Sequence, residues 1–269
     1  MTRVALKNGS GGQGWARLRP MTGEDEMGLE PDEPSACNSL LARLLVGSDE
    51  IAEDAGADIG THRVAGLSVA DRDRLLAAVY RLQFGDRIEG VTHCAACAEG
   101  FEFGFSLSEL VASLDARRRI RAAGPDADGY YRLSDGTRFR IPTVRDLEAC
   151  ATAPDRIRTR TLLQRCLADP SRPVRRRSVE SAMERIAPVL SVDVQAVCPH
   201  CGRFQKVAFS LEDFLLRSFA RERRFLTHEI HRLASAYGWS LGDILRMSRE
   251  DRRSLVRRVE AETGRPVSA

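Results

Sequence analysis

The stretch "CAACAEGFEFGFSL" at residues 94–107 returns 104 positions later as "CPHCGRFQKVAFSL" at residues 198–211. The two copies align without a gap, so that Cys94 corresponds to Cys198 and Cys97 to Cys201. In each copy the CxxC pair lies between two short runs with strand-like alternation, which predicts a β-hairpin with the cysteines at its tip. The same small unit is therefore expected twice in one chain.

Together, the four cysteines predict a single metal site. A CxxC at a hairpin tip directs two sulfurs to one point and forms half of a tetrahedral site; two halves give the closed four-thiolate coordination of structural zinc. We therefore expect one structural Zn²⁺ per chain, held by Cys94, Cys97, Cys198 and Cys201. Because such a site leaves no open position for water or substrate, we expect it to stabilise the fold and not to catalyse a reaction.

The two pairs are separated by 100 residues, many more than in ordinary zinc ribbons. Lengthening a closed loop from about 15 to about 100 residues costs roughly 1.7 kcal/mol. Structural zinc contributes on the order of 10 kcal/mol or more, so the separation is tolerable. Two separate thiol pairs, or a site that has lost its metal, are the alternatives. A redox CxxC of the thioredoxin type would need a βαβ setting, which neither pair has.

Composition indicates a soluble globular protein. The chain has 269 residues, 43% of them apolar and 29% charged, which suits one large domain or two small ones. Its longest strictly apolar run is six residues, too short for a membrane span, and the N-terminus lacks the apolar stretch of a secretory signal. We therefore expect a cytoplasmic, reducing location, where Cys37, Cys150 and Cys166 would be buried free thiols.

The expected fold class is α+β: a zinc-ribbon-like pair of CxxC β-hairpins, split by a long insertion, with a mainly helical remainder. The chain divides into five predicted segments: a flexible N-terminal arm (1–36), N-terminal helices with the first CxxC hairpin (37–114), an insertion with a hairpin and helices (115–190), the second CxxC hairpin (191–210) and a C-terminal helical region (211–269). The arm is predicted from its Gly, Pro and acidic residues, although residues 15–26 could form an edge strand.

Helix signals are clear at several places. A helix is expected from Ser68, its N-cap, to Gly85, with Leu75, Val79 and Leu82 on the buried face. Further expected elements are a helix at 39–46, a loop from there to residue 66, a hairpin at 130–141 turning at Asp135-Gly136, helices at 144–151, 159–167 and 179–186, a long helix at 211–237, and capped helices opening at Ser240 and Ser248. The residues predicted to be most buried are Leu75, Val79, Phe105, Phe209, Leu226, Ile230 and Leu233.

Other motifs do not favour an enzyme. "THEIHRL" carries His228 and His231 three apart, whereas the HExxH metalloprotease helix needs histidines four apart. His93 and His200 adjoin the cysteines and are interpreted as neighbours of the site. The sequence contains no nucleophile elbow and no phosphate-binding glycine loop, so we expect no catalytic residues and no small-molecule substrate.

A nucleic-acid-binding protein is the alternative. Residues 217–265 carry twelve arginines against seven acidic residues, and 228–246 could be read as a helix-turn-helix beside a zinc ribbon. However, the acids are interspersed among the arginines and aromatic platforms are absent, which favours solvated helix faces.

Three stretches resemble the T4-type baseplate protein family, found in phage tails and phage-tail-like contractile injection systems. They are "RLRPMTGEDE" (17–26), "LSVADRDRLLAAVYRLQFGDRIEGVTHC" (67–94) and "LTHEIHRLASAYGWSLGDILRMSREDRR" (226–253). The second knuckle, "CPHCG", fits the family's CPxCG pattern, whereas the first reads "CAACA". The resemblance implies a non-enzymatic part in building the baseplate hub. It also implies other baseplate, hub or tail proteins as partners, no membrane, and a cytoplasmic location or a place in the assembled particle.

Overall fold

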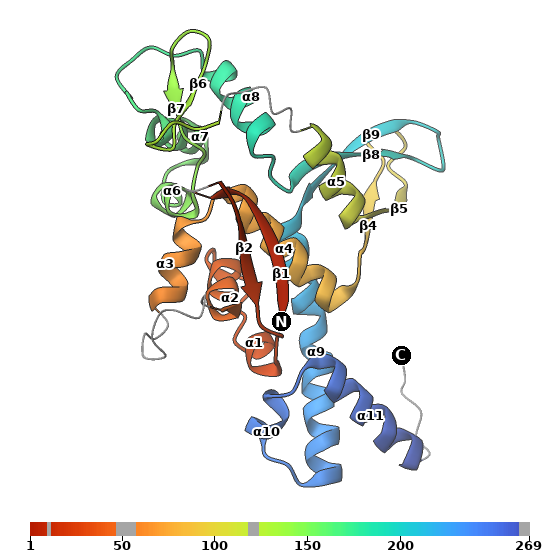
Figure 1. Cartoon of the computed structure of the whole chain (residues 1–269). Coiled ribbons are helices and arrows are strands. Elements are labelled where there is room, and N and C mark those ends of the chain that lie inside the picture. The colour runs from red at the N-terminus through yellow and green to blue at the C-terminus, as the bar shows by residue number, and fades with distance from the viewer. Residues whose placement is uncertain (10–11, 47–57, 118–123, 264–269) are drawn as a thin grey trace. The chain divides into compact units, whose positions relative to one another are not determined.

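The computed structural model describes residues 1–9, 12–46, 58–117 and 124–263 (Figure 1). It is an α+β structure of helices and small antiparallel sheets, as expected. The chain forms two compact units. One unit holds residues 4–15 and 62–211, with both CxxC hairpins and the insertion; the other holds residues 1–3, 16–61 and 212–269.

The hairpin-containing unit begins with β1 (Thr2–Gly9) and the first half of β2 (Gly12–Leu18). The boundary between the two units falls within α3 (Asp58–Gly66), at residue 62. The elements that follow in this unit are α4 (Val69–Phe84), β4 (Arg87–His93), β5 (Gly100–Ser106), α5 (Leu107–Arg117), β6 (Tyr131–Arg132), β7 (Arg138–Phe139), α6 (Val144–Cys150), α7 (Asp155–Cys166), α8 (Arg176–Ile186), β8 (Ser191–Val197) and β9 (Phe204–Ser210). The predicted hairpins and helices of the insertion are thus confirmed, with end shifts of a few residues.

Helix α4 forms where the sequence predicts it. The Ser68 hydroxyl accepts a hydrogen bond from the Asp71 amide at 3.1 Å, and Gly85 ends the helix with φ of 85°. Leu75 and Val79 are buried, but Leu82 is 55% exposed, so its predicted burial is wrong. Around the axis of α4, the centre of the buried face lies midway between the directions of residues 75 and 80. At 3.6 residues per turn, the Leu82 side chain is rotated by about 90° around the axis from that centre.

The Asp71 carboxylate also fixes β1. It is 1% exposed and accepts hydrogen bonds from the backbone amides of Lys7 at 2.7 Å and Asn8 at 2.9 Å. The Lys7 ammonium in turn pairs with Asp115 of α5 at 2.5 Å. The start of the chain is therefore an ordered strand in this unit, held by polar contacts that a composition argument does not reveal.

The insertion has its own core. Phe139, Leu163 and Val179 are buried together, with Leu167 and Ala182 beside them. The β6–β7 turn uses Gly136 at φ of 82°, as the Asp-Gly pair predicts. This core joins the short hairpin to α7 and α8, so the insertion is a folded piece and not a loose loop.

The second unit contains α1 (Gly23–Met27), α2 (Ala36–Leu44), β3 (Leu45–Val46), α9 (Leu211–Tyr237), α10 (Leu241–Leu245) and α11 (Arg249–Thr263). Leu233, Ile244 and Val256 pack together from its last three helices. Ser240 and Ser248 cap α10 and α11, with hydroxyls that accept from the amides of Asp243 and Asp251 at 3.2 Å each. The helical prediction for the described part of the C-terminal region is confirmed.

Buried charges join the N-terminal segment to the C-terminal helices. Glu26 of α1 pairs with Arg249 at 2.6 Å and with Arg252 at 2.7 Å, and Arg252 also reaches Glu229 of α9 at 3.0 Å. The Arg252 side chain is fully buried, and those of Glu26 and Glu229 are 5% and 7% exposed. We call these four residues the buried ion network.

Two predictions about the first 66 residues are wrong. Residues 1–36 are not a flexible arm in their described part: they form β1, β2 and α1, and bury Leu18, Met21 and Leu29. The predicted loop up to residue 66 contains α3. Its first residues belong to the same unit as α2, and an added Cβ on Gly60 would collide there with the Ala42 carbonyl. The rest of that loop, residues 47–57, lies outside the described residues.

Most of the predicted core is confirmed. Leu75, Val79, Phe209, Leu226 and Leu233 are buried, whereas Phe105 and Ile230 are half-buried. Cys37, Cys150 and Cys166 are buried thiols that form no disulfide, as expected.

Candidate metal centre

Each CxxC knuckle is built by its hairpin. In the first, the Cys94 amide donates to the Glu99 carbonyl at 2.9 Å and the Ala98 amide to the Cys94 carbonyl at 2.9 Å. In the second, the Cys198 amide donates to Arg203 at 3.0 Å and the Gly202 amide to Cys198 at 2.9 Å. The same two bonds thus fold both knuckles, as the aligned sequences predict.

The hairpins agree in register as well. Strand β4 pairs with β5 from Arg87↔Ser106 to His93↔Gly100, and β8 with β9 from Ser191↔Ser210 to Val197↔Phe204. Each hairpin then continues into a helix, α5 or α9. Every one of these positions in the second copy is 104 residues after its counterpart, so the sequence repeat is also a structural repeat.

The four sulfurs lie close together. Their Sγ atoms all lie within 4.8 Å of one another, with Cys94 to Cys201 at 3.6 Å and Cys97 to Cys198 at 3.7 Å. These distances exclude disulfides, whose S–S bond is about 2.05 Å. A regular tetrahedron with Zn–S bonds of about 2.3 Å has S···S edges of roughly 3.8 Å. The cluster therefore has the size of a four-thiolate metal site, and the two CxxC pairs lie together in one possible metal site.

The contacts follow an approximate twofold relation. Exchanging the two copies converts the Cys94–Cys201 contact into the Cys198–Cys97 contact, and the two distances differ by 0.1 Å. Phe105 packs edge-on against its own counterpart Phe209, with ring centroids 5.0 Å apart. Equivalent residues that touch each other in this way are typical of an isologous interface. The repeat behaves like a small dimer formed within one chain.

Two residues that the sequence analysis did not single out complete the site. Phe101, 5% exposed, packs with Cys94 and Cys198. Its counterpart Gln205 accepts a hydrogen bond from the Ala95 amide at 3.0 Å and donates to the His93 carbonyl at 3.5 Å, linking the hairpins. The signal for both was their place in the repeat, because residues 101 and 205 occupy the same position in the two copies and differ in residue type.

Electrostatics favour a thiolate at Cys94. Hydrogen bonds from the backbone amides of Cys97 and Ala96 lower the pKa of Cys94 to about 6. The Glu99 amide lowers the pKa of Cys97, but burial and hydrogen bonds with the other three thiols outweigh it and raise that pKa to about 12. If the other cysteines of the cluster also lost their protons, the negative charges of the neighbouring thiolates would repel one another. A bound cation would offset this repulsion.

The predicted histidine neighbours stay outside the cluster. Among the described residues, the group that could hold a metal ion consists of the four cysteines and contains neither His93 nor His200. His228 lies on the surface of α9, with Nε2 3.9 Å from Glu260 Oε1, and His231 is also exposed. The structure thus brings together all four predicted ligands.

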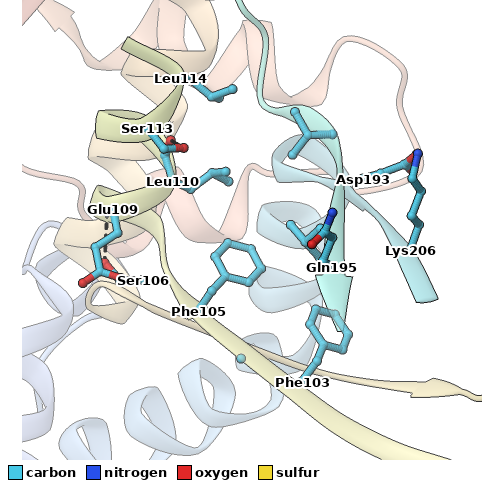
Figure 2. A pocket seen from close by; sticks show the side chains of 13 residues that line it. Phe103, Phe105, Ser106, Glu109, Leu110, Ser113, Leu114, Asp193, Gln195 and Lys206 are labelled. Carbon is cyan, nitrogen blue, oxygen red and sulfur yellow. Dashed lines mark hydrogen bonds and ion pairs between the residues drawn. The ribbon is translucent and has the colours of Figure 1, made fainter. Parts of the chain in front are cut away.

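A groove of about 520 Å³ lies beside the hairpins, between α5 and the edges of β5 and β8 (Figure 2). Phe105 projects into it from β5, and Leu110 and Leu114 from α5. Its rim carries Asp193 and Lys206, whose charged groups are 3.7 Å apart. The groove has an apolar floor and a rim of mixed charge, unlike the positive surface that binds nucleic acid.

The knuckles differ at one strained position. Ala98 has φ of 60°, in the left-handed region that glycine tolerates best, and its counterpart Gly202 has φ of 70°. We expect Ala98→Gly to stabilise the protein by about 0.5–1 kcal/mol, because glycine removes the Cβ strain at some cost in chain entropy. Urea unfolding measures the change.

Gly202→Ala is the matched substitution. An added Cβ there would meet no atom within 4 Å, so any effect comes from the backbone alone. It should destabilise the protein by about the amount that Ala98→Gly gains. Changes of the same sign in both variants would contradict this account.

No family model, no curated protein and no solved structure matches the chain. Within the described residues, no helix has both the length and the apolar character needed to cross a bilayer.

Proposed function

We propose that this chain is a non-enzymatic structural or assembly protein of the baseplate of a phage tail or phage-tail-like contractile injection system. The resemblance of residues 17–26, 67–94 and 226–253 to the T4-type baseplate family motivates the proposal. The observation that carries it is the cluster of Cys94, Cys97, Cys198 and Cys201, a closed site of the kind that stabilises a fold.

Zinc is the metal that this donor set suits best. Four thiolates in a tetrahedral arrangement select zinc or an iron–sulfur cluster among common protein metals. With S···S distances of 3.6 and 3.7 Å, one small ion would fill the space between the sulfurs. All four ligand positions would be taken by protein, so the ion would hold the hairpins together without taking part in a reaction.

Protein partners suit the charge distribution better than nucleic acid does. Of the twelve arginines in residues 217–265, at least five form ion pairs with acidic residues of this chain: Arg223, Arg246, Arg249, Arg252 and Arg253. An arginine already paired with a carboxylate contributes little to the counterion release that drives binding to nucleic acid. This observation weighs against the helix-turn-helix alternative.

A cluster of exposed aromatic and aliphatic side chains offers a surface for a neighbouring baseplate subunit. Tyr237 and Trp239 stack with ring centroids 4.7 Å apart and are 37% and 39% exposed, and Leu241 is 51% exposed. Tyrosine and tryptophan dominate the binding energy of protein interfaces. We assign the partner contact to this aromatic cluster, defined by Tyr237, Trp239 and Leu241.

Trp239→Ala should reduce particle assembly strongly while the fold stays intact. Loss of a tryptophan at the centre of an interface costs about 2 kcal/mol or more of binding, roughly a thirtyfold weaker association. The stability of the isolated protein should fall by no more than about 1 kcal/mol, because the side chain is already partly in water. Particle yield in a cell that assembles contractile tails, with thermal melting of the purified variant, measures both effects.

Trp15→Ala is the matched control, since Trp15 is 63% exposed and lies on β2. It should leave assembly unchanged. Normal particles from Trp239→Ala would remove the proposed contact. Absence of sheath, tube and spike genes beside this gene, together with normal particles when the gene is deleted, would overturn the baseplate proposal itself.

A further inference from the structure

The insertion carries a hollow that the proposed function does not use. It has a volume of about 710 Å³ and lies between the β6–β7 turn and α8. We call it the basic hollow, because three arginines line it. Its lining residues are Leu133, Ser134 and Asp135 from the turn, and Arg175, Arg177, Ser178, Ser181 and Arg185 from α8 and the residue before it.

One face of α8 supplies most of this lining. Arg177, Ser181 and Arg185 are four residues apart and therefore form one stripe along the helix. The opposite face packs in the insertion core, where Val179 is fully buried and Ala182 is 5% exposed. The arginines thus project from a helix whose position is fixed by its packing.

The β6–β7 turn, which forms the opposite wall of the hollow, is also held in place. Arg172 donates hydrogen bonds to the carbonyl of Asp135 at 2.8 Å and to that of Gly136 at 3.4 Å, which ties the turn to the segment before α8. Thr137, 3% exposed, donates its amide to the Asp135 carboxylate at 2.9 Å. Both walls are therefore defined before any ligand arrives, which lowers the entropy cost of binding.

The charge of the hollow is positive. Three arginines face one aspartate, a net charge of +2. Among the described residues, no carboxylate forms an ion pair with Arg177 or Arg185, whereas the neighbouring Arg176 pairs with Glu180 at 3.5 Å. The serine hydroxyls at 134, 178 and 181 add hydrogen-bond donors. The whole set is suited to oxyanions.

From this arrangement we infer that the basic hollow binds an acidic peptide segment of another protein. Arg177 and Arg185 are eight residues apart, about 12 Å along the axis of α8. In an extended chain, carboxylates four residues apart are separated by about 13 Å. An extended segment with acidic residues at that spacing can therefore reach both guanidinium groups at once, and each group can bind a carboxylate with two parallel hydrogen bonds.

A peptide suits the lining better than a nucleic acid does. No aromatic side chain is among the lining residues, and single-stranded nucleic acid depends on stacking against aromatic rings. Asp135 would repel a backbone that carries a charge at every unit, whereas a peptide can place a neutral residue there. The inference of an acidic-peptide site depends on the arginines that line the hollow, and it does not require a baseplate role.

Fluorescence anisotropy of a labelled ten-residue glutamate peptide tests the inference on the full chain. The wild-type protein should bind it, and added salt should weaken the binding. Arg177→Gln and Arg185→Gln should each weaken it two- to fivefold, and the double variant roughly tenfold. Arg176→Gln removes the same charge next to the hollow but outside its lining, and should change the affinity by less than twofold.

Other outcomes decide against the inference. If Arg176→Gln and Arg177→Gln weaken peptide binding equally, the affinity depends on the net charge of the protein and not on the basic hollow. A ten-nucleotide single-stranded DNA is the second probe. If it binds more tightly than the glutamate peptide, and if the double variant loses that binding, the hollow is a nucleic-acid site. Full competition by millimolar inorganic phosphate would make it a site for small anions. Melting curves that match the wild type exclude unfolding as the cause of any loss.

Discussion

Cys198→Ser should lose the bound metal and roughly 3 kcal/mol or more of stability. Structural zinc binds small domains with about 10–16 kcal/mol, and four sulfurs share that energy. Cys198 is fully buried and lies 3.7 Å from Cys97, so a serine there leaves a three-thiolate site with a gap on its inner side. Elemental analysis of freshly reduced wild-type protein should find about one zinc per chain, and the variant should hold much less.

Cys150→Ser separates loss of metal from loss of a buried thiol. Cys150 is 1% exposed and is not part of the sulfur cluster, so this variant should keep one zinc per chain. A chelator should lower the melting temperature of the wild type and of Cys150→Ser, but not that of Cys198→Ser. No zinc in the reduced wild type, or equal zinc in all three proteins, would contradict the zinc proposal. Iron in place of zinc would change the metal but keep the site.

The candidate site was predictable because its information lies in a repeat. Cys94 and Cys198 share a spacing, a strand pattern and a following Phe-Ser-Leu, and hairpin geometry then brings both pairs to tips that can meet. The roles of Phe101 and Gln205 were not predictable, because nothing in the local sequence shows that the ring is buried against the cysteines or that its counterpart accepts and donates hydrogen bonds across the interface.

The helices with local signals were predictable for a related reason. Ser68, Ser240 and Ser248 cap helices through amides three residues away, so the information lies within one turn of chain. In the N-terminal 36 residues such a signal is present at α1, where the Asp25 carboxylate accepts a hydrogen bond from the Thr22 amide at 3.0 Å, but it accounts for that short helix only. Their order depends on partners far along the sequence: Lys7 meets Asp71 and Asp115, and Glu26 meets Arg249 and Arg252. A composition rich in glycine and acids indicates flexibility only where those acids have no partners.

Glu26→Gln should therefore destabilise the protein strongly, by about 3–5 kcal/mol. The substitution removes the carboxylate that Arg249 and Arg252 share, and both guanidinium groups are buried, with side chains 7% and 0% exposed. Glu229 would remain as the buried partner of Arg252, and Glu222, 3.9 Å from Arg249, would be a longer and weaker partner for the second arginine. The buried ion network itself would then carry two positive charges against one negative charge. Breaking a buried pair by removing one partner is costly because the charge left behind has lost its water.

Glu24→Gln gives the matched control, because Glu24 lies two residues away on α1 and is exposed. Its effect should stay within about 0.5 kcal/mol. Urea unfolding of both variants, followed by circular dichroism, measures the difference; the loss should fall on the transition of the unit that contains α9 and α11, since the chain has two compact units. If Glu26→Gln costs no more than Glu24→Gln, the N-terminal segment does not depend on the buried ion network. The ordering of α1 would then have to come from its other contacts, which are the burial of Leu18, Met21 and Leu29 and the ion pairs of Asp25 with Arg19 and Arg43.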